Sequence, residues 1–253
     1  MNKEVSQNEV EKLLDLIDQK KEKLDQCRPL TEGELERLSE EFVIEYTYNS
    51  NAIEGNTLTL RETDLVLRGL TIDKKPLKEH FEAVGHKEAF DFVRELVQKN
   101  EALSETNILQ IHQLVLADKR EDRGIYRCVP VRILGSSHLP AQPYQIRPMM
   151  EELLKNYANS SEHILPKLAR FHIEFERIHP FIDGNGRTGR LIVNFELMKA
   201  GFPPIDIKFT DRLAYYDAFD EYQKNSSPKA METLFATYLN EELDRYLAMF
   251  DQQ

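Results

Sequence analysis

The residues HPFIDGNGRTGR, from His179 to Arg190, form a polar, glycine-rich stretch between two apolar stripes. Each stripe repeats at steps of three and four residues, which predicts an amphipathic helix on either side of the stretch. Such helices bury their apolar faces against other elements, so we expect a helix–loop–helix unit within a helical core. The stripes consist of Leu168, Phe171, Phe175 and Ile178 before the loop, and of Leu191, Phe195 and Met198 after it.

Helical patterns also dominate the remainder of the chain. An apolar stripe runs from Val10 to Leu24 and ends before Pro29. The pairs Thr31–Glu34 and Thr59–Glu62 have the spacing of capping boxes, which predict helix starts, and Gly69 suits the end of the second helix. Further helices are expected at residues 78–99, 105–117, 211–224 and 228–250.

One segment has a different pattern. Residues 118–147 contain several glycines and prolines, and the sequence VRIL at Val131–Leu134 is the one candidate strand. With the following GSS turn and HLPAQP, it predicts a short β-hairpin or flap at residues 131–143. The predicted fold class is therefore mainly α: a single helical domain at residues 44–250, with this hairpin and an N-terminal helical layer at residues 1–43.

Composition limits the classes of function that the chain can have. The 253 residues are enough for a sizeable core, and 33 Lys and Arg against 44 Asp and Glu give a net charge of -11. This balance argues against general nucleic-acid binding, which needs a basic footprint. Cys27 and Cys128 are far apart and lack metal-ligand spacing, and there is no apolar signal core or membrane-length apolar run. We expect a cytoplasmic protein with reduced thiols and no membrane partner.

The glycine-rich stretch has the features of a phosphate site. Gly184 and Gly186 flank Asn185 and allow backbone N–H groups to converge on a ligand. A helix that begins near Arg187 adds its unpaired N–H groups and the positive end of its dipole. Arg187 and Arg190 are three residues apart and share one face of the first turn. The combination predicts a nest for more than one phosphate.

Two residues at this nest point to a reaction. Asp183 is a single carboxylate beside the phosphate site, the pattern in which Mg²⁺ is held by one carboxylate, phosphate oxygens and water. His179 has an ordinary pKa near neutrality and suits a general base. Taken singly, each of these residues is more often structural, and Phe181 is best explained as a core anchor. Together they predict phosphoryl or nucleotidyl transfer.

A second motif precedes the loop. Ser50 and Glu54 are four residues apart and share a face if this segment is helical, and Gly55 would end that helix. A glutamate at a helix C-terminus faces the negative end of the dipole, so it is better placed when it meets a cation. A solvated surface glutamate is the alternative.

HPFIDGNGRTGR resembles, at every defining position, the signature of the Fic domain, and weaker similarity to this Fic/DOC family extends over about residues 44–247, including GIYR at 124–127. The resemblance implies transfer of AMP from ATP to a Ser, Thr or Tyr hydroxyl of a target protein. It makes His179 the base and Asp183 the Mg²⁺ ligand, and Arg190 would bind the γ-phosphate. The remaining nucleotide-binding positions in the loop are Gly184, Asn185, Gly186, Arg187, Thr188 and Gly189.

The resemblance also assigns residues outside the loop. In the flap, Ile133, Leu134 and His138 would hold the target segment by strand addition. Tyr215 and Tyr216 match an aromatic pair that encloses the adenosine, although such tyrosines are more often core residues. Gln223 stands near the base, where the family has Asn.

The segment SNAIEG at residues 50–55 resembles the inhibitory motif of Fic proteins that carry their own inhibitory helix, placed here near residues 44–55. It implies an ion pair between Glu54 and Arg190, with Ser50 fixing the helix. The pair would occupy the guanidinium that the γ-phosphate needs.

Two other functions stay open. Some family members with this glutamate remove AMP from targets, in which case Glu54 would act on a water. A non-catalytic nucleotide-binding module is the other, although intact His179 and Asp183 argue against it. Donors other than ATP (UMP, phosphate or phosphocholine carriers) occur in related enzymes. The expected partners are a target protein, the chain itself as a target of automodification, and a second copy in a homodimer, since family members often use self-association for regulation.

Overall fold

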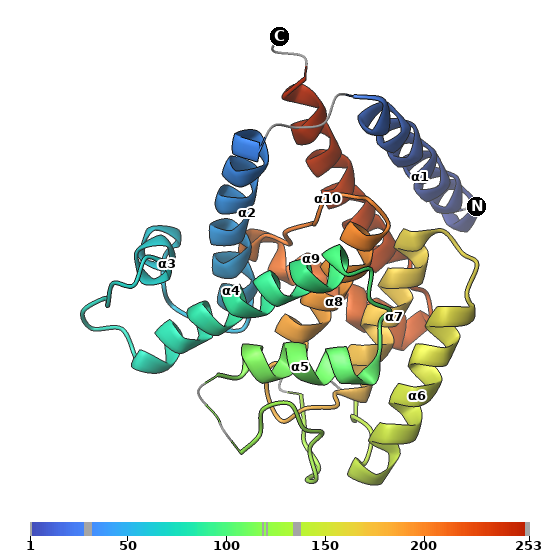
Figure 1. Cartoon of the computed structure of the whole chain (residues 1–253). Helices are drawn as coiled ribbons and strands as arrows, with labels where there is room; N and C mark the ends of the chain where they lie inside the picture. Colours follow the sequence, from blue (N-terminus) through green and yellow to red (C-terminus); the bar gives the residue numbers. More distant parts are fainter. Residues whose placement is uncertain (1, 28–31, 118, 120, 134–137, 251–253) are drawn as a thin grey trace.

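The structure is a computed structural model that describes residues 2–27, 32–117, 119, 121–133 and 138–250 (Figure 1). These residues form ten α-helices and one short 3₁₀-helix. None of the helices in the described part is both long and apolar enough to cross a bilayer. The elements are α1 (Asn2–Gln26), α2 (Glu32–Ile53), α3 (Leu60–Leu67), α4 (Leu77–Gln98), α5 (Glu105–Val115), α6 (Pro143–Asn159), α7 (Ile164–Ile178), α8 (Asn185–Lys199), η1 (Phe209–Asp211), α9 (Arg212–Asn225) and α10 (Lys229–Ala248).

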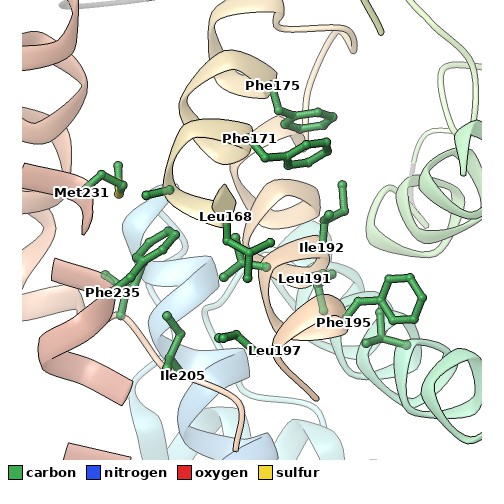
Figure 2. Packing of buried hydrophobic residues seen from close by; sticks show 14 of the residues in the cluster. Leu168, Phe171, Phe175, Leu191, Ile192, Phe195, Leu197, Ile205, Met231 and Phe235 are labelled. Carbon is green, nitrogen blue, oxygen red and sulfur yellow. The ribbon is translucent and has the colours of Figure 1, made fainter. Parts of the chain in front are cut away.

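Helices α7 and α8 form the centre of the fold and confirm the predicted helix–loop–helix unit. Helix α7 packs against α6, α8 and α10, and α8 packs against α4, α5 and α7. Figure 2 shows the apolar side chains of α7, α8 and α10 converging on one core. Residues 179–184, between the two helices, are therefore attached at both ends to the most buried part of the molecule.

Several predicted helix boundaries are confirmed. The Thr59 hydroxyl accepts from the Glu62 N–H, and the Glu62 carboxylate accepts from the Thr59 N–H, so α3 begins with the predicted capping box. Gly69 follows α3 with φ of 87°. Thr31, the cap proposed for the preceding helix, lies outside the described residues.

The N-terminal helix packs on the outside of the core, against the last helix of the chain. Helix α1 packs against α10 and buries Ile17 completely (Figure 1). Helix α2 runs without interruption from Glu32 to Ile53, so the predicted boundary between residues 43 and 44 falls inside a helix. The division of the chain into an extension and a domain stays a prediction.

The predicted hairpin is not confirmed. Residues 131–133 and 138–142 contain no strand, and Leu134 lies outside the described part of the chain. Arg127 donates to the carbonyl oxygens of Val129 (2.8 Å) and Ala141 (2.5 Å), on the two limbs of this segment. The Arg127 side chain therefore connects Val129 to Ala141, and the hairpin stays a prediction.

Candidate active site

A cavity of about 660 Å³ lies beside the loop between α7 and α8, within the usual size of ligand sites. Its walls come from the end of α2, from α7 and the loop, and from α9. The sequence-predicted residues that line it are Glu54, Ile133, His138, His179, Asp183, Gly184, Asn185, Gly186, Tyr215, Tyr216 and Gln223. The structure thus brings residues from four separate segments to one cavity.

The loop is held from inside by Asn185. Its side-chain oxygen accepts from the Phe181 N–H at 2.9 Å, and its amide nitrogen donates to the Phe181 carbonyl at 3.0 Å. Phe181 is fully buried, which confirms its role as a core anchor. The Asn185 amide, which was predicted to bind phosphate, is therefore engaged by the backbone of the loop.

His112 of α5 holds the loop from the other side. Its ring stacks on Phe181 with centroids 3.6 Å apart. Nε2 donates to the Asp183 carbonyl at 3.0 Å, and Nδ1 accepts from the Gly124 N–H at 2.9 Å. These partners require the neutral tautomer with the proton on Nε2, and burial agrees with this by lowering the pKa of His112 to about 4. Sequence reasoning missed this residue, which has no motif of its own.

Arg127 braces the start of the loop. Its Nε donates to the His179 carbonyl at 2.8 Å, and its N–H donates to the Pro180 carbonyl at 3.0 Å. In the sequence, GIYR at residues 124–127 is a sign of similarity only and assigns Arg127 no role. Since Arg127 is buried and binds the backbone of the loop and of Val129 and Ala141, it positions these parts of the chain relative to one another.

Asp183 is the candidate metal ligand, and both of its carboxylate oxygens are engaged. Oδ1 accepts from the Gly184 N–H at 2.7 Å and from Arg187 at 3.3 Å, and Oδ2 accepts from Lys119 at 2.7 Å. Burial alone would raise the pKa of Asp183, but the Lys119 hydrogen bond and the nearby positive charges lower it to about 2.

A divalent cation fits Asp183 if other groups complete its coordination. The Asp183 carboxylate is ionised at neutral pH and already binds one cation, the Lys119 ammonium group. The described residues contain no group of three or more His, Cys, Asp or Glu that could bind a metal ion. The protein thus offers one carboxylate, which suits Mg²⁺ when phosphate oxygens and water supply the other ligands.

His179 caps the C-terminus of α7 in a left-handed conformation, with φ of 51°. This uncommon backbone for a non-glycine residue turns the chain sharply from α7 into the loop. Burial lowers the pKa of His179 to about 4, so the imidazole is neutral near pH 7 and has a lone pair to accept a proton.

Glu176 is a further acidic group in the cavity that sequence reasoning missed. Its Oε2 lies 3.8 Å from Nδ1 of His179, and its side chain is 15% exposed. Burial, together with the nearby charge of Glu54, raises the pKa of Glu176 to about 8 despite the opposing effect of Arg190. The carboxyl is therefore protonated at neutral pH. Its spacing of three from His179, on the same helix, is the signal that could have identified it.

Arg190 is only 3% exposed and makes three kinds of contact with α2 and the residue after it. It donates to the Ser50 hydroxyl at 3.0 Å and to the Ser50 carbonyl at 2.8 Å. It also forms an ion pair with Glu54 at 2.8 Å. Gly186 makes room for this pair, because a Cβ at Gly186 would overlap the Glu54 carboxylate. The pair implied by the sequence motif is thus present in the structure.

Arg187 is also turned toward α2. Its guanidinium is 2% exposed and donates to the Asn51 side chain at 3.4 Å, and Glu82 of α4 lies 3.7 Å away. Asn51 was not predicted. Arg187, Thr188, Gly189 and Arg190 do not line the cavity; they are buried behind the residues that do.

The two tyrosines differ in their surroundings. Tyr215 is buried, and its hydroxyl bonds to Arg190 at 3.2 Å and to His172 at 2.8 Å. Tyr216 is 43% exposed and donates to the Ile53 carbonyl at the end of α2, at 3.0 Å. In the predicted flap, Ile133 lines the cavity, and Nε2 of His138 bonds to the Arg177 carbonyl at 2.9 Å.

Comparisons with known proteins agree on one family. Residues 102–197 match the model of the Fic/DOC family. The chain is 34% identical over 244 residues to the protein adenylyltransferase Fic of Nematostella vectensis, and 32% identical over 250 residues to that of Drosophila melanogaster. The matches cover 94% and 96% of this chain but 56% and 50% of those proteins. The chain thus spans about half the length of these curated relatives.

Solved structures extend the similarity to the fold. Fic-1 from C. elegans superposes with a TM-score of 0.88 at 25% identity, over 99% of this chain and 75% of that one. A Fic domain containing signaling protein from Bacteroides thetaiotaomicron gives a TM-score of 0.81 at 28% identity, over 93% and 94% of the two chains.

Proposed function

Because the chain is a member of the Fic/DOC family, we propose that it transfers AMP from ATP to a hydroxyl group of a target protein and that Glu54 inhibits this reaction. The similarity to protein adenylyltransferases supports the reaction class. The observation that carries the proposal is the ion pair between Glu54 and Arg190, placed next to a cavity that His179 and Asp183 line.

In the proposed reaction, the target hydroxyl oxygen attacks the α-phosphorus of ATP. The bond from that phosphorus to the bridging oxygen breaks, and pyrophosphate leaves with the electron pair. The hydroxyl proton moves to His179, which is neutral because burial holds its pKa at about 4. Arg127 and His112 keep the loop in place during this step through their bonds to its backbone.

The loop and the start of α8 bind the phosphates in this proposal. Gly184 and Gly186 line the cavity at the N-terminus of α8, where the helix dipole favours anions. Asp183 would hold Mg²⁺, which when bound offsets the negative charge of the phosphates. Asn185 keeps the loop in this shape through Phe181, and Tyr216 with Gln223 forms the wall at which we place the nucleoside.

Glu54 inhibits by binding the guanidinium that the γ-phosphate needs. An arginine–carboxylate pair is charge-assisted, and this one is reinforced by two bonds from Arg190 to Ser50. ATP then lacks a partner for its γ-phosphate, so its α-phosphate is not oriented for attack.

Transfer is tested by incubating the chain with α-phosphate-labelled ATP and cell lysate. We expect Glu54→Gly to raise labelling of the chain and of targets by about tenfold or more, since each 1.4 kcal/mol in the broken pair corresponds to a factor of ten. Adding His179→Ala to Glu54→Gly should lower labelling at least about 100-fold. Equal labelling by the parent and Glu54→Gly would contradict the inhibitory role, and labelling that survives His179→Ala would contradict the role of the base.

Removal of AMP is the second candidate, because the Glu54 carboxylate itself lines the cavity and could orient a water. Water would then attack the phosphorus of the modified side chain, and the target hydroxyl would leave. Release of AMP from a pre-modified target, lost in Glu54→Gly, would favour this reaction over transfer. A chain that binds ATP but catalyses neither reaction would be a non-catalytic nucleotide-binding module.

A further inference from the structure

The two oxygens of the Asp183 carboxylate are engaged in different ways. Oδ1 bonds to the adjoining Gly184 N–H and to Arg187, whose buried guanidinium is fixed by α2. Oδ2 bonds to Lys119, which stands in a separate segment just after the end of α5. The partners of Oδ1 thus belong to the loop and to α8 itself, whereas the partner of Oδ2 reaches it from another part of the chain.

The Lys119 side chain can move away from Asp183 at a low cost in free energy. It is 36% exposed, so its ammonium group can return to water without the cost of a buried charge. Arg187, at 2% exposed, has no such route. Of the two carboxylate oxygens, Oδ2 is therefore the one whose bond can be exchanged for a bond to a metal ion.

We propose that the Lys119 ammonium occupies the position on Asp183 Oδ2 that Mg²⁺ takes when ATP binds, so that metal loading requires displacement of Lys119. The proposal rests on the proposed function, since it concerns the same nucleotide site. An ammonium nitrogen lies 2.7 Å from Oδ2, and Mg²⁺ would bind a carboxylate oxygen at about 2.0–2.1 Å. Two cations so close to one oxygen repel each other, so the metal ion competes with the ammonium group for it.

Lys119 has a second consequence for the metal-free chain. Its hydrogen bond holds the Asp183 carboxylate in place beside the loop. The monovalent ammonium group occupies the position on Asp183 Oδ2 until a divalent ion, which arrives with the nucleotide, replaces it. Removing it should thus leave a carboxylate with less competition for the metal.

The test measures metal binding rather than turnover. In the full chain carrying Glu54→Gly, which removes the competing ion pair, free Mn²⁺ is followed by electron paramagnetic resonance at saturating β,γ-imido ATP analogue. We expect Lys119→Met to lower the half-saturating Mn²⁺ concentration by about 1.4- to 5-fold, the range for a partly exposed ion pair. Lys119→Arg, which keeps a cation within reach, should resemble the parent.

The control is Lys87→Met, which removes a lysine of similar exposure from an ion pair with Asp91 on α4. It tests the effect of losing one positive charge elsewhere and should leave the half-saturating Mn²⁺ concentration unchanged. An unchanged or higher Mn²⁺ requirement in Lys119→Met would overturn the exchange. If the parent binds no Mn²⁺ with the analogue at all, the proposed function is itself wrong and the inference falls with it.

Discussion

At the scale of single residues, the buried Arg190 guanidinium has other partners besides Glu54, among them the Tyr215 hydroxyl at 3.2 Å. Arg190 binds Ser50 through its side chain and main chain, and binds Glu54 through one carboxylate oxygen. The main-chain bond survives any substitution at Ser50, but the hydroxyl bond does not. On the proposed mechanism, Ser50 therefore adjusts the strength of the pair between Glu54 and Arg190 without being part of it.

Ser50→Ala should raise labelling from α-phosphate-labelled ATP by a few fold, and less than Glu54→Gly does. Loss of the hydroxyl leaves Nε of Arg190 without its acceptor and loosens the guanidinium, whereas the pair with Glu54 remains. Ser50→Thr keeps a hydroxyl and serves as the control. A labelling rate in Ser50→Ala equal to that of the parent would show that the Ser50 side chain has no part in inhibition.

His112 allows a second prediction at this scale. His112→Phe keeps a ring against Phe181 but leaves the Asp183 carbonyl and the Gly124 N–H without partners, and should lower the free energy of unfolding by about 2 kcal/mol. If His112 positions the metal-binding residue, the same variant also raises the half-saturating Mn²⁺ concentration. His112→Gln offers an amide N–H near the position of Nε2 and should restore part of the metal binding. Lower stability with unchanged metal binding would mean that His112 only stabilises the fold.

At the scale of elements, helix α2 is held at the end that carries Ser50, next to Glu54. The Asn49 side chain donates to Asp206 at 2.7 Å and accepts from the Phe209 N–H at 3.0 Å. Tyr216 of α9 binds the last carbonyl of α2. These contacts fix the last turns of the helix to the segment between α8 and α9.

Asn49→Ala should loosen the end of α2 without removing any residue of the inhibitory pair. Two buried hydrogen bonds are lost, which corresponds to about 2 kcal/mol. We expect faster amide hydrogen exchange in residues 45–53, measured by mass spectrometry, together with a higher rate of labelling. Exchange in α10 should not change and provides the internal reference. Unchanged exchange in residues 45–53 would contradict this role of Asn49.

The features of the elements that could be predicted from the sequence are the local ones. The capping box of Thr59 and Glu62 is a local interaction, and the apolar stripes around the loop are local patterns, so both could be predicted. His112, Arg127 and Asn51 act through contacts with residues about 50 to 140 positions away, and a single sequence contains no signal for such pairings. The inhibitory pair spans a similar separation, and it could be predicted only because its two halves resemble family motifs.

At the scale of the whole molecule, buried ionisable groups give the stability a dependence on pH. Burial lowers the pKa values of His86, His112, His172 and His179 below the ordinary 6.5. The unfolded chain then binds protons that the folded chain does not, so the free energy of unfolding decreases as the pH falls below about 6.5. Glu176 has the opposite sign, because its folded pKa of about 8 exceeds the unfolded value. Its contribution decreases as the pH rises from about 4.5 to 8.

The free energy of unfolding should accordingly be highest near pH 6.5 and decrease toward pH 8 by up to about 1.4 kcal/mol per pH unit. In Glu176→Gln, which has no proton to lose, the decrease between pH 6.5 and 8 should disappear, whereas the loss of stability below pH 6.5 should remain. Urea denaturation at pH 5.5, 6.5 and 8 measures both slopes. A parent and a Glu176→Gln variant with parallel curves above pH 6.5 would contradict the raised pKa of Glu176.

The proposed competition between Glu54 and ATP for Arg190 has a thermodynamic consequence. On the proposed mechanism, Glu54 and the γ-phosphate of ATP exclude each other, so their binding to Arg190 is linked with negative cooperativity. Linkage is reciprocal: a ligand that strengthens productive binding of ATP by some factor, because it releases α2, is itself bound more tightly by the same factor when ATP is present. Helix α2 is 22 residues long, and Ser50, which binds Arg190, and Ile53, which lines the cavity, lie in its last turn. A protein that binds its other end could therefore act as an allosteric activator without entering the cavity.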